Sequence, residues 1–156
     1  MADAKAHALG SEGRHFGRYI SQIYWRSRAR LERELRPFGV GPRTYPVLLS
    51  LYHGDGRSQE ELARNIGVDK AAIKRAVDEL VKEGFAVRGE HESDGRAYRV
   101  RLTDKARSIE AGVEEVLTAW ESQLLRGLSR SGRAEARALL SKVADNAALA
   151  SDLPES

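Results

Sequence analysis

Residues 69–103 read DKAAIKRAVDELVKEGFAVRGEHESDGRAYRVRLT, and this stretch decides the fold. Asp69 can cap a helix that Gly84 ends, and apolar residues recur between them at helical spacing. The stripe expected to be buried consists of Ile73, Val77, Leu80 and Val81. Residues 85–87 and 98–102 read with period two, as strands do, which predicts two strands around a polar loop at 89–97. The stretch therefore predicts a short amphipathic helix followed by a β-hairpin.

A second short helix is expected directly upstream. Residues 58–61, SQEE, have the form of a capping box, in which the serine hydroxyl and a glutamate carboxylate accept hydrogen bonds from each other's amides. Leu62, Ala63 and Ile66 supply an apolar face, and Gly67 can take the left-handed conformation that ends a helix. Two short helices joined at a glycine predict a helix-turn-helix, and a hairpin after it predicts a winged helix.

Helical patterns flank this unit on both sides. Before it, one helix is expected from about Gly13 to Pro37. A second should settle only near Thr44, because Pro46 cannot donate a backbone hydrogen bond. After it, Thr103 can cap a long helix, and a break at 127–132 precedes a last one. Their apolar residues are, in order, Phe16, Tyr19, Ile20, Ile23, Tyr24, Leu31 and Leu35; Val47, Leu48, Leu51 and Tyr52; Ile109, Val113, Val116, Leu117, Trp120, Leu124 and Leu128; and Ala136, Leu139, Leu140 and Val143.

The expected fold is mainly α with a small β-hairpin wing. Residues 37–103 would form the winged helix-turn-helix, and residues 1–36 with 104–156 a helical dimerisation region. A central unit of this size cannot cover the apolar stripes of the long terminal helices. We therefore expect these helices to cover each other and their copies in a partner subunit.

Composition argues against several classes of protein. The absence of cysteine excludes disulfides and thiolate metal sites. No apolar run is long enough to span a membrane, and the first residues lack a signal-peptide hydrophobic region, so the cytoplasm is the expected location. The four histidines are scattered, and no nucleophile grouping or phosphate-binding loop is present. We therefore expect neither an enzyme, nor a cofactor, nor a metal site.

The wing carries the most specific pattern. Arg88, Asp94, Arg96, Leu102 and Thr103 fit R-x5-D-x-R-x5-LT at each spacing. In this pattern, and in the helix-turn-helix before it, the chain resembles the MarR family of winged-helix regulators over about residues 14–149. The resemblance implies a homodimer whose recognition helices enter major grooves of double-stranded DNA, with each wing in the adjacent minor groove. Two departures are Ala106, where many members have glycine, and Pro46, where the urate-responsive branch has aspartate nearby; urate sensing is therefore not implied.

Within that resemblance, the helix that Asp69 can cap and Gly84 stops would be the recognition helix. With Ile73 and Val77 inward, steps of 100° place Ala71, Arg75 and Lys82 opposite, and Lys70 with Lys74 on one flank. The acids that follow at positions 78 and 79 would repel phosphate, so contacts should concentrate in the first two turns. The DNA-binding residues predicted here are Lys70, Ala71, Lys74 and Arg75, with Arg64 as either a phosphate contact or a surface ion pair. The alternative to DNA binding is that these cations form only a solvated face of the helix.

At the wing, Arg96 is expected to enter the minor groove and Asp94 to fix its rotamer. An ordinary turn with incidental charges is the alternative. Arg88 is expected to brace the wing, whereas Arg99 and Arg101 would meet phosphates.

The first helix is rich in arginine. Between Arg14 and Arg43 the chain has eight arginines against two glutamates, although the whole chain carries only +3. The favoured reading is ion pairing with Glu114, Glu115 and Glu121 of the other long helix. The alternative is a pocket for a small aromatic acid, as the family often has, with walls from Tyr19, Tyr24, Trp25, Arg26 and Tyr45.

The function expected from these patterns is a homodimeric repressor of a pseudo-palindromic operator, released by a small ligand such as an aromatic or phenolic acid. The alternative is a constitutive winged-helix DNA-binding protein or activator without an effector. A protein-interaction module would differ from both, because its DNA binding would be absent.

Overall fold

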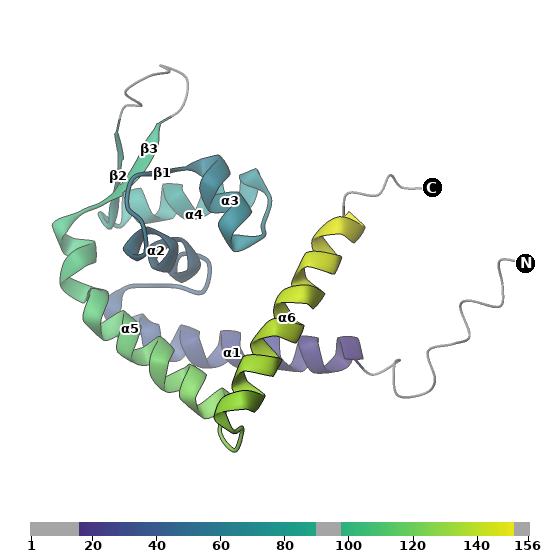
Figure 1. Ribbon diagram of the computed structural model, residues 1–156. Coiled ribbons are helices and arrows are strands. Elements are labelled where there is room, and N and C mark those ends of the chain that lie inside the picture. Colours follow the sequence, from purple (N-terminus) through teal and green to yellow (C-terminus); the bar gives the residue numbers. More distant parts are fainter. Residues whose placement is uncertain (1–15, 90–97, 152–156) are drawn as a thin grey trace, which may run out of the picture.

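The computed structural model describes residues 16–89 and 98–151, with side-chain environments up to residue 148 (Figure 1). Helices and strands follow the expected order, with one additional short strand. The elements are α1 (Phe16–Leu35), η2 (Arg36–Phe38), α2 (Tyr45–Tyr52), β1 (Arg57–Ser58), α3 (Gln59–Ile66), α4 (Lys70–Lys82), β2 (Ala86–Gly89), β3 (Arg99–Leu102), α5 (Asp104–Leu124) and α6 (Arg130–Ser151). None of the helices in these ranges is long and apolar enough to cross a bilayer.

The predicted caps of the helix-turn-helix are confirmed. The Ser58 hydroxyl accepts from the Glu61 N–H at 3.2 Å, and the Glu61 carboxylate accepts from the Ser58 N–H at 2.6 Å. Gly67 ends α3 with a φ of +75°. The Asp69 carboxylate then accepts from the Ala72 N–H at 2.6 Å and begins α4. These local contacts fix the angle at which α4 leaves α3.

The start of α2 follows the constraint set by proline. The helix begins at Tyr45, which places Pro46 in the first turn, where its missing N–H requires no partner. Residues 41–44 instead form a turn, in which the Thr44 hydroxyl accepts from the Gly41 N–H at 3.1 Å. The expected start near Thr44 is confirmed.

The sheet has three antiparallel strands in the order β1-β3-β2. The predicted hairpin strands pair in the register Ala86↔Leu102 to Gly89↔Arg99. The strand β1 pairs with the other edge of β3 and was not predicted, because two residues are too few to show an alternating pattern. Its effect is to join the start of α3 to the base of the wing.

One core holds the middle of the chain together. It runs from the C-terminal end of α1 through α2, the helix-turn-helix and the sheet to the first half of α5. Its largest fully buried side chains are Leu35, Leu48, Leu51, Leu62, Ile73, Leu80, Val47, Val77, Val100 and Val113. Of the predicted α1 stripe only Leu31 and Leu35 are buried.

The remaining long helices lie largely outside this core. Figure 1 shows α6 and the first half of α1 projecting from the central unit. Among the described residues α6 has no buried side chain, and Leu139 and Leu140 are exposed, as are Ile20 and Ile23 of α1. Within the part of the chain that the structure describes, much of the apolar surface predicted for these two helices is therefore left uncovered.

Candidate nucleic-acid interface

The helix α4 presents a basic face over a buried one. Ile73, Ala76, Val77 and Leu80 are buried against the core. The predicted contact residues Ala71, Lys74 and Arg75 are all exposed on its first two turns. The N-terminal end of a helix carries a partial positive charge, which adds to these cations. This face can approach phosphates and base edges without disturbing the core.

Lys70 is exposed but already has an acidic partner. Its ammonium donates to the Glu60 carboxylate at 2.9 Å. This hydrogen bond from Lys70 is the main cause that lowers the pKa of Glu60. The pair bridges the starts of α3 and α4, so a phosphate would have to compete with Glu60 for this cation.

Arg64 was expected to contact phosphate or form an ion pair. Its side chain lies exposed on α3, and no ion pair joins it to an acid in residues 16–89 and 98–148. Its long-range charge nevertheless lowers the pKa of Glu60. The phosphate contact remains a prediction, and no internal ion pair competes with it.

The wing is braced against α4 at its base. Arg88 of β2 forms an ion pair with Asp78 of α4, and its guanidinium lies 5.0 Å from the centre of the Tyr98 ring. Hydrogen bonding with Tyr98, and then with Asp78, raises the pKa of Arg88. These contacts give Arg88 the expected structural role of bracing the wing. These contacts join the base of the wing to α4.

Arg99, which was expected to meet phosphate, has protein partners. Its guanidinium donates to the Gly56 carbonyl at 2.7 Å and to the Glu61 carboxylate at 3.2 Å. The side chain therefore joins the wing to β1 and the start of α3, and it is turned toward protein groups instead of phosphates. A phosphate contact by Arg99 stays a prediction, and it would compete with these protein partners, which the sequence did not indicate because β1 was not predicted.

The wing tip was assigned the two remaining DNA-contact residues. Arg96 and Asp94 lie outside the described residues, so their minor-groove roles remain predictions from the family resemblance.

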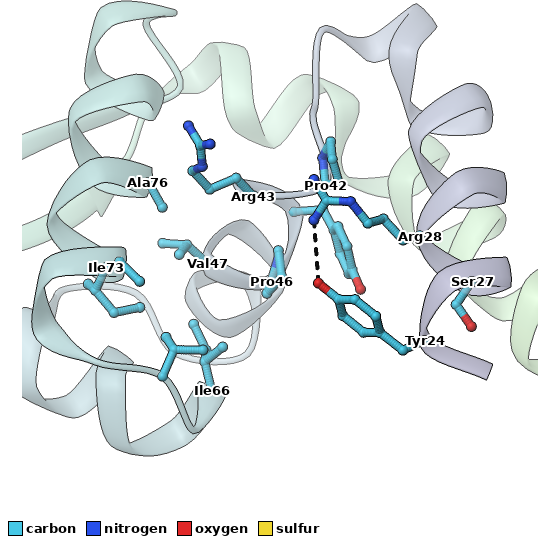
Figure 2. Close-up of a pocket in the computed structure, with 13 residues that line it drawn as sticks. Tyr24, Ser27, Arg28, Pro42, Arg43, Pro46, Val47, Ile66, Ile73 and Ala76 are labelled. Atoms are coloured by element: carbon cyan, nitrogen blue, oxygen red, sulfur yellow. Dashed lines mark hydrogen bonds between the residues drawn. The ribbon is translucent and has the colours of Figure 1, made fainter. Parts of the chain in front are cut away.

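A cavity of about 250 Å³ lies between α1, α2 and the helix-turn-helix (Figure 2). Its wall is largely apolar, with two arginines and two tyrosines. The lining residues are Tyr24, Ser27, Arg28, Pro42, Arg43, Tyr45, Pro46, Val47, Ile66, Val68, Ala72, Ile73 and Ala76. Because three of them belong to α4, an occupant would touch the inner side of the recognition helix.

The predicted pocket residues divide into two groups. Tyr24 and Tyr45 line the cavity, whereas Tyr19, Trp25 and Arg26 do not. These three are exposed on other faces of α1, and a role for them in ligand binding stays a prediction. Successive residues of a helix turn by 100°, so the residue that shares the face of Tyr24 is the one four positions later.

That residue is Arg28, which the sequence reasoning missed, together with Arg43. Arg28 donates to the Tyr24 hydroxyl at 3.5 Å, as drawn in Figure 2. Burial is the main cause that raises the pKa of Tyr45, with Tyr24 adding to it and Arg28 opposing it. The cavity thus combines an apolar wall with cationic and phenolic groups, which suits an amphiphilic anion.

The pairing expected between α1 and the acids of α5 is not formed. Arg30 and Arg33 pair instead with Glu34 of their own helix, at 2.9 and 3.5 Å. Toward α5, Arg30 contacts Gln123 and lies 5.1 Å from the centre of the Trp120 ring. Glu121, which was expected to pair with the first helix, pairs instead with Arg137 of α6 at 3.7 Å. The helices α1 and α5 therefore meet through a cation–π contact and an amide.

Comparison with known proteins places these features in one family. The family model for the MarR family matches residues 38–97. A MarR transcriptional regulator from Methanosarcina mazei Go1 is 29% identical, with a TM-score of 0.78, over 87% of this chain and 99% of that one. The transcriptional repressor CouR, solved on a 23-mer DNA duplex, is 26% identical with a TM-score of 0.74, over 87% of this chain and 96% of that one.

A more distant structure shares the fold. It is a putative MarR family regulator from Listeria monocytogenes complexed with 26mer DNA, 17% identical with a TM-score of 0.82, over 89% of this chain and 96% of that one. The matched segment contains the whole helix-turn-helix, and the likeness to the Methanosarcina mazei regulator covers 87% of this chain. Residues 38–97 therefore match the MarR family, and over most of its length the chain is similar to solved MarR-family transcriptional regulators.

Proposed function

We propose that the protein is a homodimeric repressor that binds a pseudo-palindromic operator and releases it when a small aromatic acid occupies the cavity. The observation that carries DNA binding is the basic, exposed face of α4 above a fully buried stripe. Lys70, Ala71, Lys74 and Arg75 would approach the major groove, with Arg64 on phosphate and Arg96, positioned by Asp94, in the minor groove. Lys70 would exchange Glu60 for a phosphate on binding.

Dimerisation is supported by the uncovered apolar side chains of α1 and α6. Phe16, Ile20 and Ile23 of α1 and Leu139 and Leu140 of α6 are each at least two-fifths exposed. Apolar surface of this kind is unusual on a monomer and marks interaction sites. Residues 1–36 and 104–156 would thus form the dimerisation region, and residues 37–103 would contact DNA. The two-fold axis would be mirrored in half-sites about one helical turn apart.

Effector release is supported by the position of the cavity. It joins α1, from the proposed dimerisation region, to α4, from the DNA-binding region. A ligand there would change the spacing of the two recognition helices and so weaken operator binding. The solved relative CouR is a repressor, which supports repression over activation.

The experiment is a titration of a fluorescent operator duplex with protein at fixed salt, repeated with benzoate, salicylate and cinnamate. The proposal expects at least one acid to raise the dissociation constant for the operator without changing the binding of random duplex. The alternative, a constitutive regulator or an activator with no effector, predicts unchanged operator affinity with every acid.

A further inference from the structure

One ion pair connects the wall of the cavity to the recognition helix. Arg43, which lines the cavity, lies 3.4 Å from the Glu79 carboxylate, measured from Nη1 to Oε2. Glu79 lies on α4, one helical turn after Ala76, which also lines the cavity. In Figure 2 the Arg43 guanidinium is turned toward α4. The pair therefore ties α4 to the segment that precedes α2.

The two arginines of the cavity wall are in different situations. Arg28 is half-buried and donates to the Tyr24 hydroxyl, and no carboxylate pairs with it in residues 16–89 and 98–148. Arg43 is committed to Glu79. An anion entering the cavity would thus find one cation without an acidic partner and one that must leave its partner.

The pair is weak enough for such an exchange. The Arg43 side chain is 61% exposed and that of Glu79 39%, so solvent screens their attraction. An anion inside an apolar cavity is screened less, and its attraction to a nearby guanidinium is correspondingly greater. Competition between the two acids for Arg43 therefore favours the occupant of the cavity.

We propose that an anionic occupant of the cavity takes Arg43 from Glu79 and thereby releases α4 from the segment before α2. The inference rests on the proposed effector function and adds its regulatory contact. Because coupling between sites is reciprocal, the ion pair weakens anion binding by the same factor by which the bound anion weakens the ion pair. Removing the Glu79 carboxylate must therefore strengthen anion binding by that factor. Exposed pairs of this kind correspond to about two- to fivefold in an equilibrium constant.

The test uses benzoate as the anion and benzamide as its neutral analogue of the same shape. Calorimetry measures the binding of each to the full-length protein and to its variants Glu79→Gln, Arg43→Gln and Glu83→Gln. Glu83 is the matched control, because it is an exposed acid at the C-terminal end of the same helix that neither lines the cavity nor pairs with Arg43. Thermal melts verify that all variants fold.

We expect Glu79→Gln to bind benzoate about two- to fivefold more tightly than wild type and Arg43→Gln to bind it more weakly. Benzamide binding should be equal in all variants, and Glu83→Gln should match wild type. Saturating benzoate should also weaken operator binding less in Glu79→Gln, since the pair is already absent.

Two results would overturn the inference in different ways. Equal benzoate affinity in wild type and Glu79→Gln removes the exchange but leaves the effector site intact. No binding of benzoate, salicylate or cinnamate by wild type or any variant contradicts the proposed effector function, and the exchange with it.

Discussion

Lys74 and Arg75 lie on the exposed face of α4, directly beside the buried Ile73 and Ala76. Long cations at this end of a recognition helix reach the acceptor groups of guanine in the major groove. We expect Arg75→Ala to lower the ratio of the operator affinity to the random-duplex affinity. If Arg75 contacts a base, this change corresponds to about 1–3 kcal/mol of binding free energy.

Lys82→Ala is the matched control for this measurement. It removes one positive charge from the far end of the same helix, beyond the first two turns. Its loss of affinity should be equal on operator and random duplex, as for a general electrostatic effect. An equal loss on both duplexes in Arg75→Ala would reduce Arg75 to a phosphate contact.

At the scale of single residues, Tyr52 provides a pH-dependent test. Burial, with added repulsion from Glu110 and Glu114, raises the pKa of Tyr52 to about 12, and its hydroxyl donates to the Ala106 carbonyl at 2.9 Å. In an unfolded chain the pKa of a tyrosine is about 10. Between these values the unfolded chain loses the Tyr52 proton while the folded chain keeps it. The stability from this group is therefore complete below pH 10 and is lost as pH rises to about 12.

We expect the difference in unfolding free energy between wild type and Tyr52→Phe to shrink between pH 10 and about 12. Urea unfolding of both proteins from pH 9 upward measures it, and other titrating groups cancel in the difference. A difference that stays constant over this range would contradict the assigned role.

Single residues on a helix were predictable where a buried stripe fixed the phase. Ile73 and Val77 oriented α4, and the exposure of Arg75 followed. In α1 the apolar residues are exposed on several sides, so no stripe pointed to Arg28. Arg43 was missed for another reason, since it lies in a turn without any periodicity.

At the scale of elements, the capping residues predicted where helices begin. Ser58 and Asp69 marked the starts of α3 and α4 because each uses a side-chain oxygen to satisfy a free backbone amide. The strand β1 gave no such signal. Its partner β3 lies more than forty residues later, and pairing over that separation depends on the folded arrangement of the whole unit.

The capping box provides the test at this scale. Ser58→Ala removes the acceptor for the Glu61 amide and should lower the unfolding free energy by about 1 kcal/mol. Ser122→Ala, an exposed position inside α5, is the control and should change it by less than about 0.5 kcal/mol. Denaturant unfolding compares the two, and equal stability of both variants would show that the cap contributes nothing.

At the scale of the whole molecule, the exposed apolar side chains of α1 and α6 form the surface that we propose a second copy covers. The double variant Ile20→Asp, Ile23→Asp places two carboxylates where the proposed interface is apolar, and burying them without partners is costly. We expect sedimentation velocity to show a dimer for wild type and a folded monomer for the double variant.

Val87→Asp is the control for dimerisation, because Val87 is an equally exposed apolar residue on the wing. It should remain dimeric. A double variant that sediments as wild type would move the interface away from α1.

The sequence predicted that a unit of this size cannot cover the apolar stripes of the terminal helices, and the division of labour between these helices and the central unit stays a prediction. How the two parts enclose a cavity was not, since its walls come from four helices and two connecting turns. Only the folded chain brings Tyr24 next to Ala72 and Ile73.

Sequence-specific binding by a two-fold dimer is tested most directly by footprinting the protein on DNA from around its own gene, over a series of salt concentrations. We expect a protected pseudo-palindrome with half-sites about one helical turn apart, and protection that falls steeply as salt increases. Protection spread evenly along the DNA, or none at any salt concentration, would contradict it.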